Sequence, residues 1–113
     1  MTHNMKLQPH PFSMIRSGQK IYELRLLDEK RRKIAPGDVL VFTNTESRDQ
    51  ITCSVKNLHI FTSFEELYRT LPLDRCGYLP EELSRASPAD MEAYYSTDEQ
   101  KMYGVVGIEI ELI

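Results

Sequence analysis

Residues 18–25 read GQKIYELR and place three charged side chains where a helix is predicted to end and a strand to begin. Upstream, Pro11 suits the first turn of a helix, and Gly18 suits its end because glycine readily takes the left-handed conformation that closes a helix. From position 20 apolar residues recur with a period of two, which predicts a strand over residues 20–27. The stretch therefore indicates a helix followed directly by a strand.

The charged residues at this junction, Lys20, Glu23 and Arg25, are candidates for a site. A lysine can neutralise a phosphate, and an arginine can hold a planar anion at two points. A glutamate whose pKa is raised by burial can exchange protons near neutral pH. In a regular strand Glu23 and Arg25 share a face and Lys20 points to the other, so a common site requires Lys20 to lie in the turn after Gly18. The alternative interpretation is an ordinary charged surface strand with one ion pair.

The rest of the chain predicts an α+β fold with a mainly antiparallel sheet. Four more strands follow from apolar runs and alternating patterns, at residues 5–8, 39–42, 51–61 and 103–112. Two more helices are predicted after the serines at positions 63 and 87, the first with a capping box. Residues 28–33 form a charged connection, and residues 44–50 form a polar hairpin loop. Apolar parity changes within residues 51–61, which predicts a bulge near positions 56–57 of the kind that bends a sheet into a barrel.

Composition and length predict one globular domain over residues 1–113, with 41% hydrophobic and 27% charged residues. No apolar run approaches the roughly 20 residues of a transmembrane helix, and no signal sequence is visible. Two cysteines without metal-like spacing predict neither a disulfide framework nor a zinc site. The expectation is a cytoplasmic protein that holds no metal and no cofactor.

Charge is distributed unevenly along the chain. The net charge of −3 is unlike that of a general nucleic-acid coat protein. Residues 1–62 nevertheless carry ten Lys/Arg against six Asp/Glu, and residues 63–113 carry four against eleven. The basic run Lys30-Arg31-Arg32-Lys33 can guide a nucleic-acid backbone, or it is simply a solvated loop. Tyr94 and Tyr95 are candidates for stacking on a base, with a core or lid position as the alternative.

Four segments in register resemble the ASCH domain family, whose members are relatives of the PUA RNA-binding fold. These segments are GxKxxExR at residues 18–25, IAPGDVLVF at 34–42, SFEEL at 63–67, and YY at 94–95 followed by YGVVGIEI at 103–110. The match covers nearly the whole chain. The resemblance implies a small PUA-like mixed or antiparallel β-barrel with flanking helices and a cleft beside residues 18–25.

The resemblance also implies a ligand, either RNA or a nucleoside or nucleotide. The residues expected to bind it are Gly18, Lys20, Glu23, Arg25, Arg31, Arg32, Lys33 and Tyr95. One bacterial branch of the family is similar to N4-acetylcytidine amidohydrolase, whose catalytic lysine corresponds to Lys20. This alternative makes Lys20 and Glu23 catalytic, although that branch has threonine where this chain has Glu23. A third possibility is a protein-interaction adaptor, which predicts no deep cleft and a fully exposed Lys20–Glu23–Arg25 set. The oligomeric state is left open.

Overall fold

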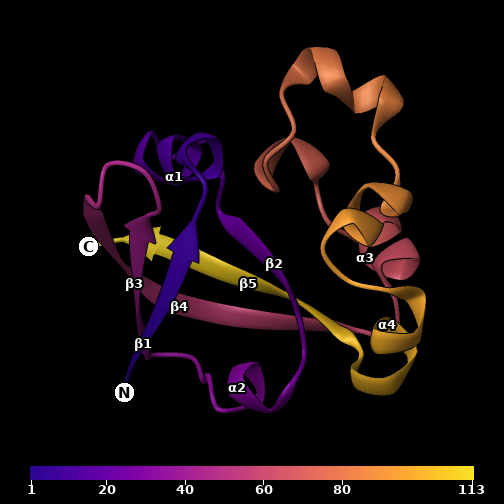
Figure 1. Cartoon of the computed structure of the whole chain (residues 1–113), viewed down its shortest axis with the longest axis horizontal. Coiled ribbons are helices and arrows are strands. Elements are labelled where there is room, and N and C mark those ends of the chain that lie inside the picture. The colour runs from indigo at the N-terminus through magenta and orange to yellow at the C-terminus, as the bar shows by residue number, and fades with distance from the viewer.

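The computed structural model describes all residues from Met1 to Ile113 and contains one five-stranded sheet of order β1-β3-β4-β5-β2. The strands are β1 (Thr2–Leu7), β2 (Tyr22–Leu26), β3 (Val39–Asn44), β4 (Gln50–Phe61) and β5 (Val105–Leu112). Only β1 and β3 pair in parallel, and the other three pairings are antiparallel. The sheet curls into a half-barrel whose two edge strands are β1 and β2 (Figure 1).

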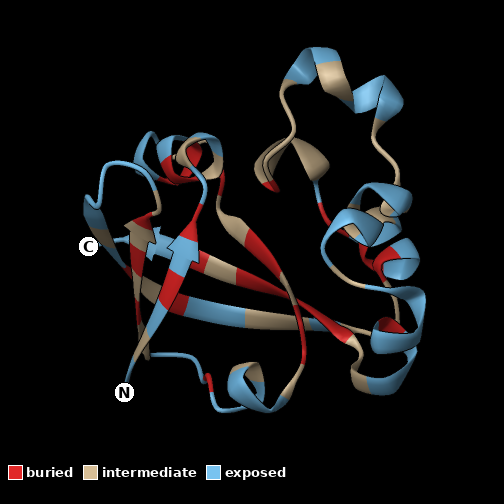
Figure 2. Ribbon diagram, in the orientation of Figure 1, coloured by how far each residue is buried: buried red, intermediate tan, exposed pale blue.

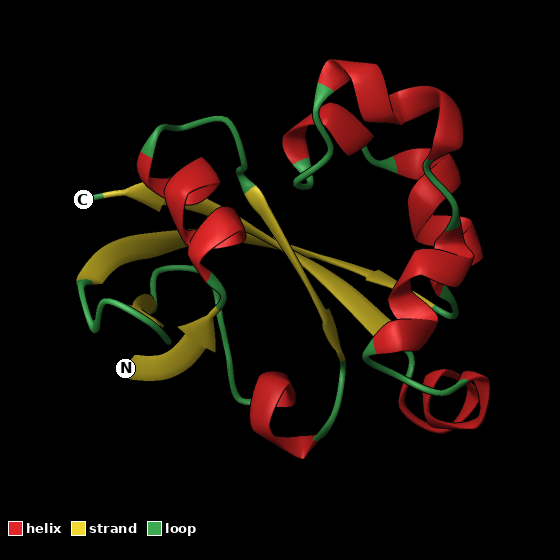
Figure 3. Ribbon diagram, turned by 45° about the horizontal axis from the view of Figure 1, so that its top comes forward, coloured by secondary structure: helices red, strands yellow, loops and turns green.

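The helices lie at the two ends of this sheet and along one side of it. They are α1 (Pro9–Arg16), α2 (Glu29–Arg32), α3 (Phe64–Thr70), η1 (Leu73–Arg75), η2 (Pro80–Arg85), η3 (Pro88–Ala93) and α4 (Thr97–Tyr103), where η marks a 3-10 helix. The segment from α3 to α4 forms a helical arm, residues 64–103, that stands beside the strands (Figure 3). None of the helices combines the length and apolar character needed to span a membrane.

The bend of the sheet comes from a bulge in β4. Register shifts between Val55 and Asn57, so the strand turns its apolar side chains from one face to the other at that point. The predicted bulge is therefore confirmed. It allows a single 12-residue strand to pair with β3 at one end and with β5 along most of its length.

Two apolar clusters hold the fold together. Inside the curl, Phe12 and Ile15 of α1 pack among residues of β1, β3, β4 and β5, with Leu40 and Phe42 fully buried. Outside it, the arm packs through Phe64 and Leu67 against β2 and β5. Buried segments accordingly concentrate on the strands and on the faces of α1 and α3 that touch them, whereas the far end of the arm is exposed (Figure 2).

Several local predictions need correction. The charged connection at residues 28–33 contains the short helix α2, because the Asp28 side chain accepts the backbone N–H of Arg31 and caps it. The predicted capping box at Ser63 is only half made. Ser63 accepts from the backbone N–H of Glu66, but the Glu66 carboxylate accepts from the hydroxyl of Thr62.

The arm also holds more helices than the sequence patterns predict. The segment predicted as a helix after Ser87 is the 3-10 helix η3, and η1, η2 and α4 were not predicted at all. These helices are three to seven residues long, too short for a 3.6-residue periodicity to be visible.

Candidate functional site

Lys20 is positioned by a turn that is hydrogen-bonded on both sides. Gly18 has φ +84°, the left-handed conformation that ends α1 and reverses the chain. The backbone N–H of Lys20 donates to the carbonyl of Met14 in α1 (3.0 Å), and that of Ile21 donates to the carbonyl of Arg75 in η1 (2.9 Å). The turn thus lies between α1 and the start of the arm. Lys20 stands two residues before β2, which begins at Tyr22.

This position lets Lys20 meet residues of the strand that follows it. Nζ of Lys20 lies 2.7 Å from Oε1 of Glu23, and the guanidinium of Arg25 contacts the other carboxylate oxygen, with Nη2 at 2.7 Å and Nε at 2.8 Å. Both oxygens of Glu23 are therefore occupied by cations. Lys20 and Glu23 are buried, at 8% and 3% exposure, and Arg25 is half-buried. We call these three residues the charged triad.

The charged triad fixes the protonation of its carboxylate. Burial alone would raise the pKa of Glu23, but the adjacent Lys20 and Arg25 outweigh it and hold the pKa below its ordinary value of 4.5. Burial likewise opposes the charge on Arg25, yet Glu23 and the nearby Tyr95 hydroxyl raise its pKa. The sequence suggested a glutamate with a raised pKa that exchanges protons near pH 7. That suggestion is wrong for this arrangement, because the carboxylate is held ionised between two cations.

Arg25 also links the two edges of the half-barrel. Its Nη2 donates to the main-chain carbonyl of Lys6 in β1 at 3.2 Å, so a side chain spans the gap that backbone pairing leaves open. A closed barrel would pair these strands directly. Here the gap between β1 and β2 becomes one side of a cleft.

The cleft has a volume of about 590 Å³ and two walls of different character. The sheet wall consists of Lys6, Leu7, Gln8, His10, Pro11, Lys20, Glu23, Leu24, Arg25 and Thr45. The arm wall consists of Tyr68, Cys76, Gly77, Tyr78, Asp90, Met91, Tyr94 and Tyr95. Three of the four charged residues of the sheet wall are cationic, whereas the arm wall is rich in tyrosine and its one charged residue is Asp90. A volume in this range suits one small ligand or one nucleotide of a longer chain.

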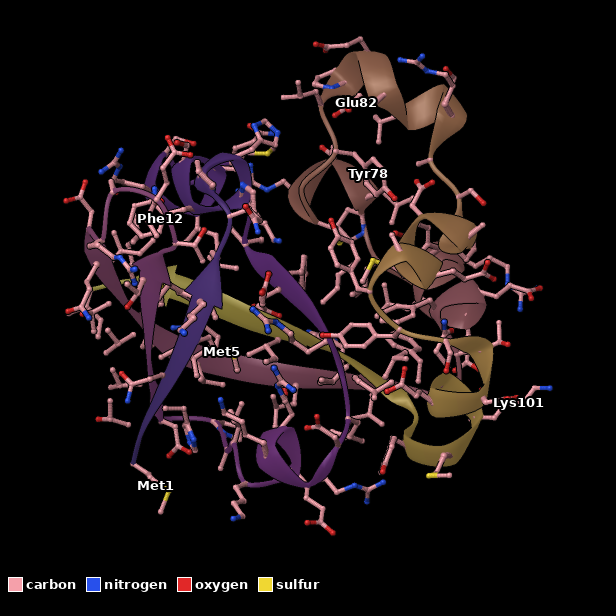
Figure 4. The ribbon with its side chains drawn as sticks, in the orientation of Figure 1. Met1, Met5, Phe12, Tyr78, Glu82 and Lys101 are labelled. Carbon is pink, nitrogen blue, oxygen red and sulfur yellow. The ribbon has the colours of Figure 1, made fainter.

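Tyrosines of the arm wall are joined by hydrogen bonds. The hydroxyls of Tyr68 and Tyr78 lie 2.7 Å apart, and the Tyr78 hydroxyl donates to Oδ2 of Asp90 at 2.6 Å. In Figure 4, Tyr78 lies on the part of the arm that faces the sheet, and Glu82 lies farther out. Tyr95 stacks on Phe64, with ring centroids 6.1 Å apart, so one of its faces is already covered. Tyr94 is 71% exposed.

The structure brings together four of the residues expected at the site, namely Lys20, Glu23, Arg25 and Tyr95. Gly18 does not line the cleft; it supplies the turn, and its carbonyl accepts from Arg75. The basic run lies outside the cleft as well. Arg31 pairs with Asp28 at 2.8 Å, and Arg32 donates to the carbonyls of Leu27 and Tyr103. The side chains of both arginines thus bind groups of the protein itself, and Lys33 is exposed beside them.

Many residues that line the cleft were not predicted from the sequence. Lys6 and His10 flank the start of α1, and Tyr68, Tyr78 and Asp90 belong to segments far along the chain. The only signal was the unusual number of tyrosines in the acidic half, which did not show that they face the triad. Cys76 lies in the cleft but is buried, and burial raises the pKa of its thiol to about 12, which does not favour a nucleophile. No group of three or more His, Cys, Asp or Glu residues is arranged to hold a metal ion.

Comparison with known proteins places the fold. The family model for the ASCH domain matches residues 5–113. The chain belongs to the ASCH domain family. The crystal structure of hypothetical protein PH0355 is similar over 100% of both chains, with 33% identity and a TM-score of 0.83. The solution NMR structure of protein PF0455 from Pyrococcus furiosus is similar over 100% of this chain and 98% of that one, with 34% identity and a TM-score of 0.73.

These matches confirm the α+β, PUA-like architecture that the resemblance implied for this ASCH domain, with a curled five-stranded sheet and flanking helices. No protein with a curated description matches the chain. The adaptor hypothesis expected an exposed triad and no deep cleft, and the structure contradicts both expectations.

Proposed function

We propose that this ASCH domain binds a nucleotide, free or as one unit of an RNA strand, in the cleft between the sheet and the arm. The observation that carries the proposal is the charged triad, in which one carboxylate fixes a buried lysine and a half-buried arginine opposite a wall rich in tyrosine. Cations neutralise a phosphate, and tyrosine rings stack on a base. A single cleft with both features suits a nucleotide better than it suits a purely apolar or purely anionic ligand.

The donors of the sheet wall support this assignment. An ammonium group has three N–H donors. The ammonium of Lys20 pairs with one carboxylate only, that of Glu23, so it keeps N–H donors for a ligand. Lys6, from β1, adds a second ammonium to the same wall. Because Glu23 holds the triad in place before a ligand arrives, little side-chain ordering remains to be done on binding.

The charge distribution of the chain supports a short ligand or a short contact with RNA. The basic sheet wall faces an arm that belongs to the acidic half of the chain. A long polyanion that leaves the cleft past the arm meets negative charge, which weakens binding. The expected contact therefore involves one or a few nucleotides and not an extended duplex.

The test is a thermal-shift and titration series with nucleosides, nucleotides and short single-stranded RNAs, since a ligand stabilises the folded state in proportion to its saturation. Two variants probe the cleft: Lys20→Ala removes a triad cation, and Tyr94→Ala removes an exposed ring. Stacking on one base contributes about 1–3 kcal/mol, so Tyr94→Ala should weaken binding by about 5- to 150-fold.

Lys33→Ala is the matched control, because it removes an equally charged lysine outside the cleft. It should leave nucleotide affinity unchanged and weaken binding only if longer RNA also crosses the basic run. Absence of any shift or titration with all these ligands at low salt would refute the proposed function.

A second candidate, hydrolysis of an acylated nucleoside such as N4-acetylcytidine, is favoured by the burial of Lys20 in a cleft of small-ligand size. The ion pair weighs against it, because the nitrogen of a paired ammonium has no lone pair with which to act as a base. Chromatography of N4-acetylcytidine incubated with wild type and Lys20→Ala tests it. Release of cytidine and acetate by wild type only would establish the activity, and no release by either would exclude this substrate.

A further inference from the structure

The hydrogen-bonded tyrosines of the arm wall have a definite direction. A tyrosine hydroxyl carries one proton, and that of Tyr78 is donated to Oδ2 of Asp90 at 2.6 Å. Tyr78 therefore has no proton left for Tyr68, and the 2.7 Å contact between the two hydroxyls must be donated by Tyr68. Both protons point along the chain Tyr68→Tyr78→Asp90.

The surroundings of Tyr78 keep this direction. Burial raises the pKa of the Tyr78 hydroxyl, and the hydrogen bond that it donates to Asp90 raises it further. The hydroxyl stays protonated across the physiological range, and its proton remains on the side of Asp90. The direction of the hydrogen bonds is therefore a fixed property of this wall.

With this direction, the Tyr68–Tyr78–Asp90 part of the arm wall offers acceptors and no donors. The remaining lone pairs of Tyr68 and Tyr78 can only accept, and Oδ1 of Asp90 takes no hydrogen bond from the protein. All three residues line the cleft. A ligand group that meets this part of the wall must donate, and an approaching carbonyl would face lone pairs and a negative charge.

The opposite wall has the reverse polarity. Lys6, Lys20 and Arg25 present N–H donors and positive charge. A ligand that spans the cleft therefore needs an anionic or accepting end for the sheet wall and a donating end for the arm wall. A nucleotide whose base carries an exocyclic amino group has both ends.

We propose that the Tyr68–Tyr78–Asp90 chain selects bases with an exocyclic amino group, so that adenosine and cytidine nucleotides bind in preference to inosine and uridine nucleotides. The proposal rests on the proposed function, because it assigns the specificity of the same cleft. Adenine carries an amino group where hypoxanthine carries a carbonyl, and its neighbouring ring nitrogen is an acceptor where that of hypoxanthine is an N–H donor. Cytosine and uracil differ in the same two ways. Each pair thus changes the donor and acceptor pattern of the base edge that the arm wall would read, while the sugar and the phosphate stay the same.

The expected preference follows from the nature of Asp90. A hydrogen bond to a charged group changes affinity by about 10- to 100-fold, and the lower value applies because Asp90 is exposed to solvent. AMP and CMP should accordingly bind about tenfold more tightly than IMP and UMP. The phosphate is common to all four ligands, so its contribution cancels within each pair.

The experiment is titration calorimetry of AMP, IMP, CMP and UMP against wild type, Asp90→Asn and Ser87→Ala. In Asp90→Asn the amide oxygen can keep the contact with Tyr78, while the amide nitrogen adds donors toward the cleft, so the preference should disappear or reverse. Ser87→Ala is the matched control. It removes the hydroxyl that caps η3 through the N–H of Ala89 but leaves the carboxylate in place, so the preference should persist.

The wild-type comparison does not depend on any variant folding. Tighter binding of AMP and CMP that is lost in Asp90→Asn and kept in Ser87→Ala would support the inference. Equal affinities within each pair would overturn the inference and leave nucleotide binding intact. An equal loss of preference in Asp90→Asn and Ser87→Ala would overturn the role of the carboxylate. No binding of any of the four would overturn the proposed function and the specificity together.

Discussion

Replacement of Glu23 by glutamine is the sharpest test of the charged triad. The substitution keeps the size of the side chain and removes its charge. Glu23 is 3% exposed, and its two oxygens contact Lys20 and Arg25 at 2.7–2.8 Å. The variant therefore leaves two neighbouring cations, with side chains 9% and 15% exposed, without a counter-charge.

The expected loss of stability is about 3 kcal/mol. Removing one partner of a buried ion pair destabilises by about 3–5 kcal/mol, because the remaining charge stays buried and unpaired. The lower value applies here because both cations border the cleft and Arg25 keeps its hydrogen bond to Lys6. For a domain of this size, about 3 kcal/mol corresponds to a fall in Tm of roughly 10 °C.

Urea or thermal unfolding of wild type and Glu23→Gln at pH 7 measures the effect. Glu65→Gln is the control, because Glu65 pairs with Arg69 at 3.8 Å and both side chains are 72% exposed, so its loss should change stability by less than about 1 kcal/mol. A Glu23→Gln protein within about 1 kcal/mol of wild type would refute the coupled triad.

The pH dependence gives a second readout of the same variant. The pKa of Glu23 is lowered below 4.5 in the folded state, since the attraction of two cations exceeds the effect of burial. The stabilisation from its charge is therefore fully present above about pH 4.5 and is lost as the pH falls through the lowered value. The difference between wild type and Glu23→Gln should shrink in acid, and a constant difference would point to packing and not to charge.

Three further predictions concern other parts of the fold. Gly107→Ala would place a methyl group 2.6 Å from Cδ1 of Leu71 under the arm, and the resulting overpacking should destabilise by about 1–3 kcal/mol in urea unfolding. The hydrogen bond from His3 lowers the pKa of Asp38 to about 2, so the stability difference between wild type and Asp38→Asn should be largest above pH 3.8 and vanish toward pH 2 in thermal melts. Burial raises the pKa of Cys76 to about 12, so a disulfide reagent should modify it at pH 8 only after unfolding; rapid modification of the folded protein would contradict its burial.

Patterns of period two predicted the strands of this domain well. The alternation at residues 20–27 and the change of parity within residues 51–61 both indicate which side chains face the core. Burial of one face of a strand fixes its pairing register, so these patterns carry structural information. The bulge between Val55 and Asn57 was predictable for the same reason. The triad was partly predictable, because the left-handed turn at Gly18 is a local feature of the sequence.

The arm wall was not predictable from local patterns. Tyr68, Tyr78 and Asp90 come from three separate short segments, and their meeting depends on how the arm packs against β2 and β5. The ionisation of Glu23 was mispredicted for a related reason. Burial was foreseen, but the sequence could not show that both oxygens of the carboxylate meet cations, and those two contacts reverse the direction of the shift.

The roles within the triad can be separated by comparing stability with binding. Lys20→Ala leaves Glu23 paired with Arg25, a neutral combination, so its effect on stability should be well below the roughly 3 kcal/mol expected for Glu23→Gln. Arg25→Ala leaves Glu23 paired with Lys20 but also removes the link to the Lys6 carbonyl across the open edge, so it should lie between the two. Denaturation of the three variants beside nucleotide titration tests this order. A Lys20→Ala protein that is stable and fails to bind would assign the ammonium to the ligand, whereas equal destabilisation by all three would make the triad a purely structural element.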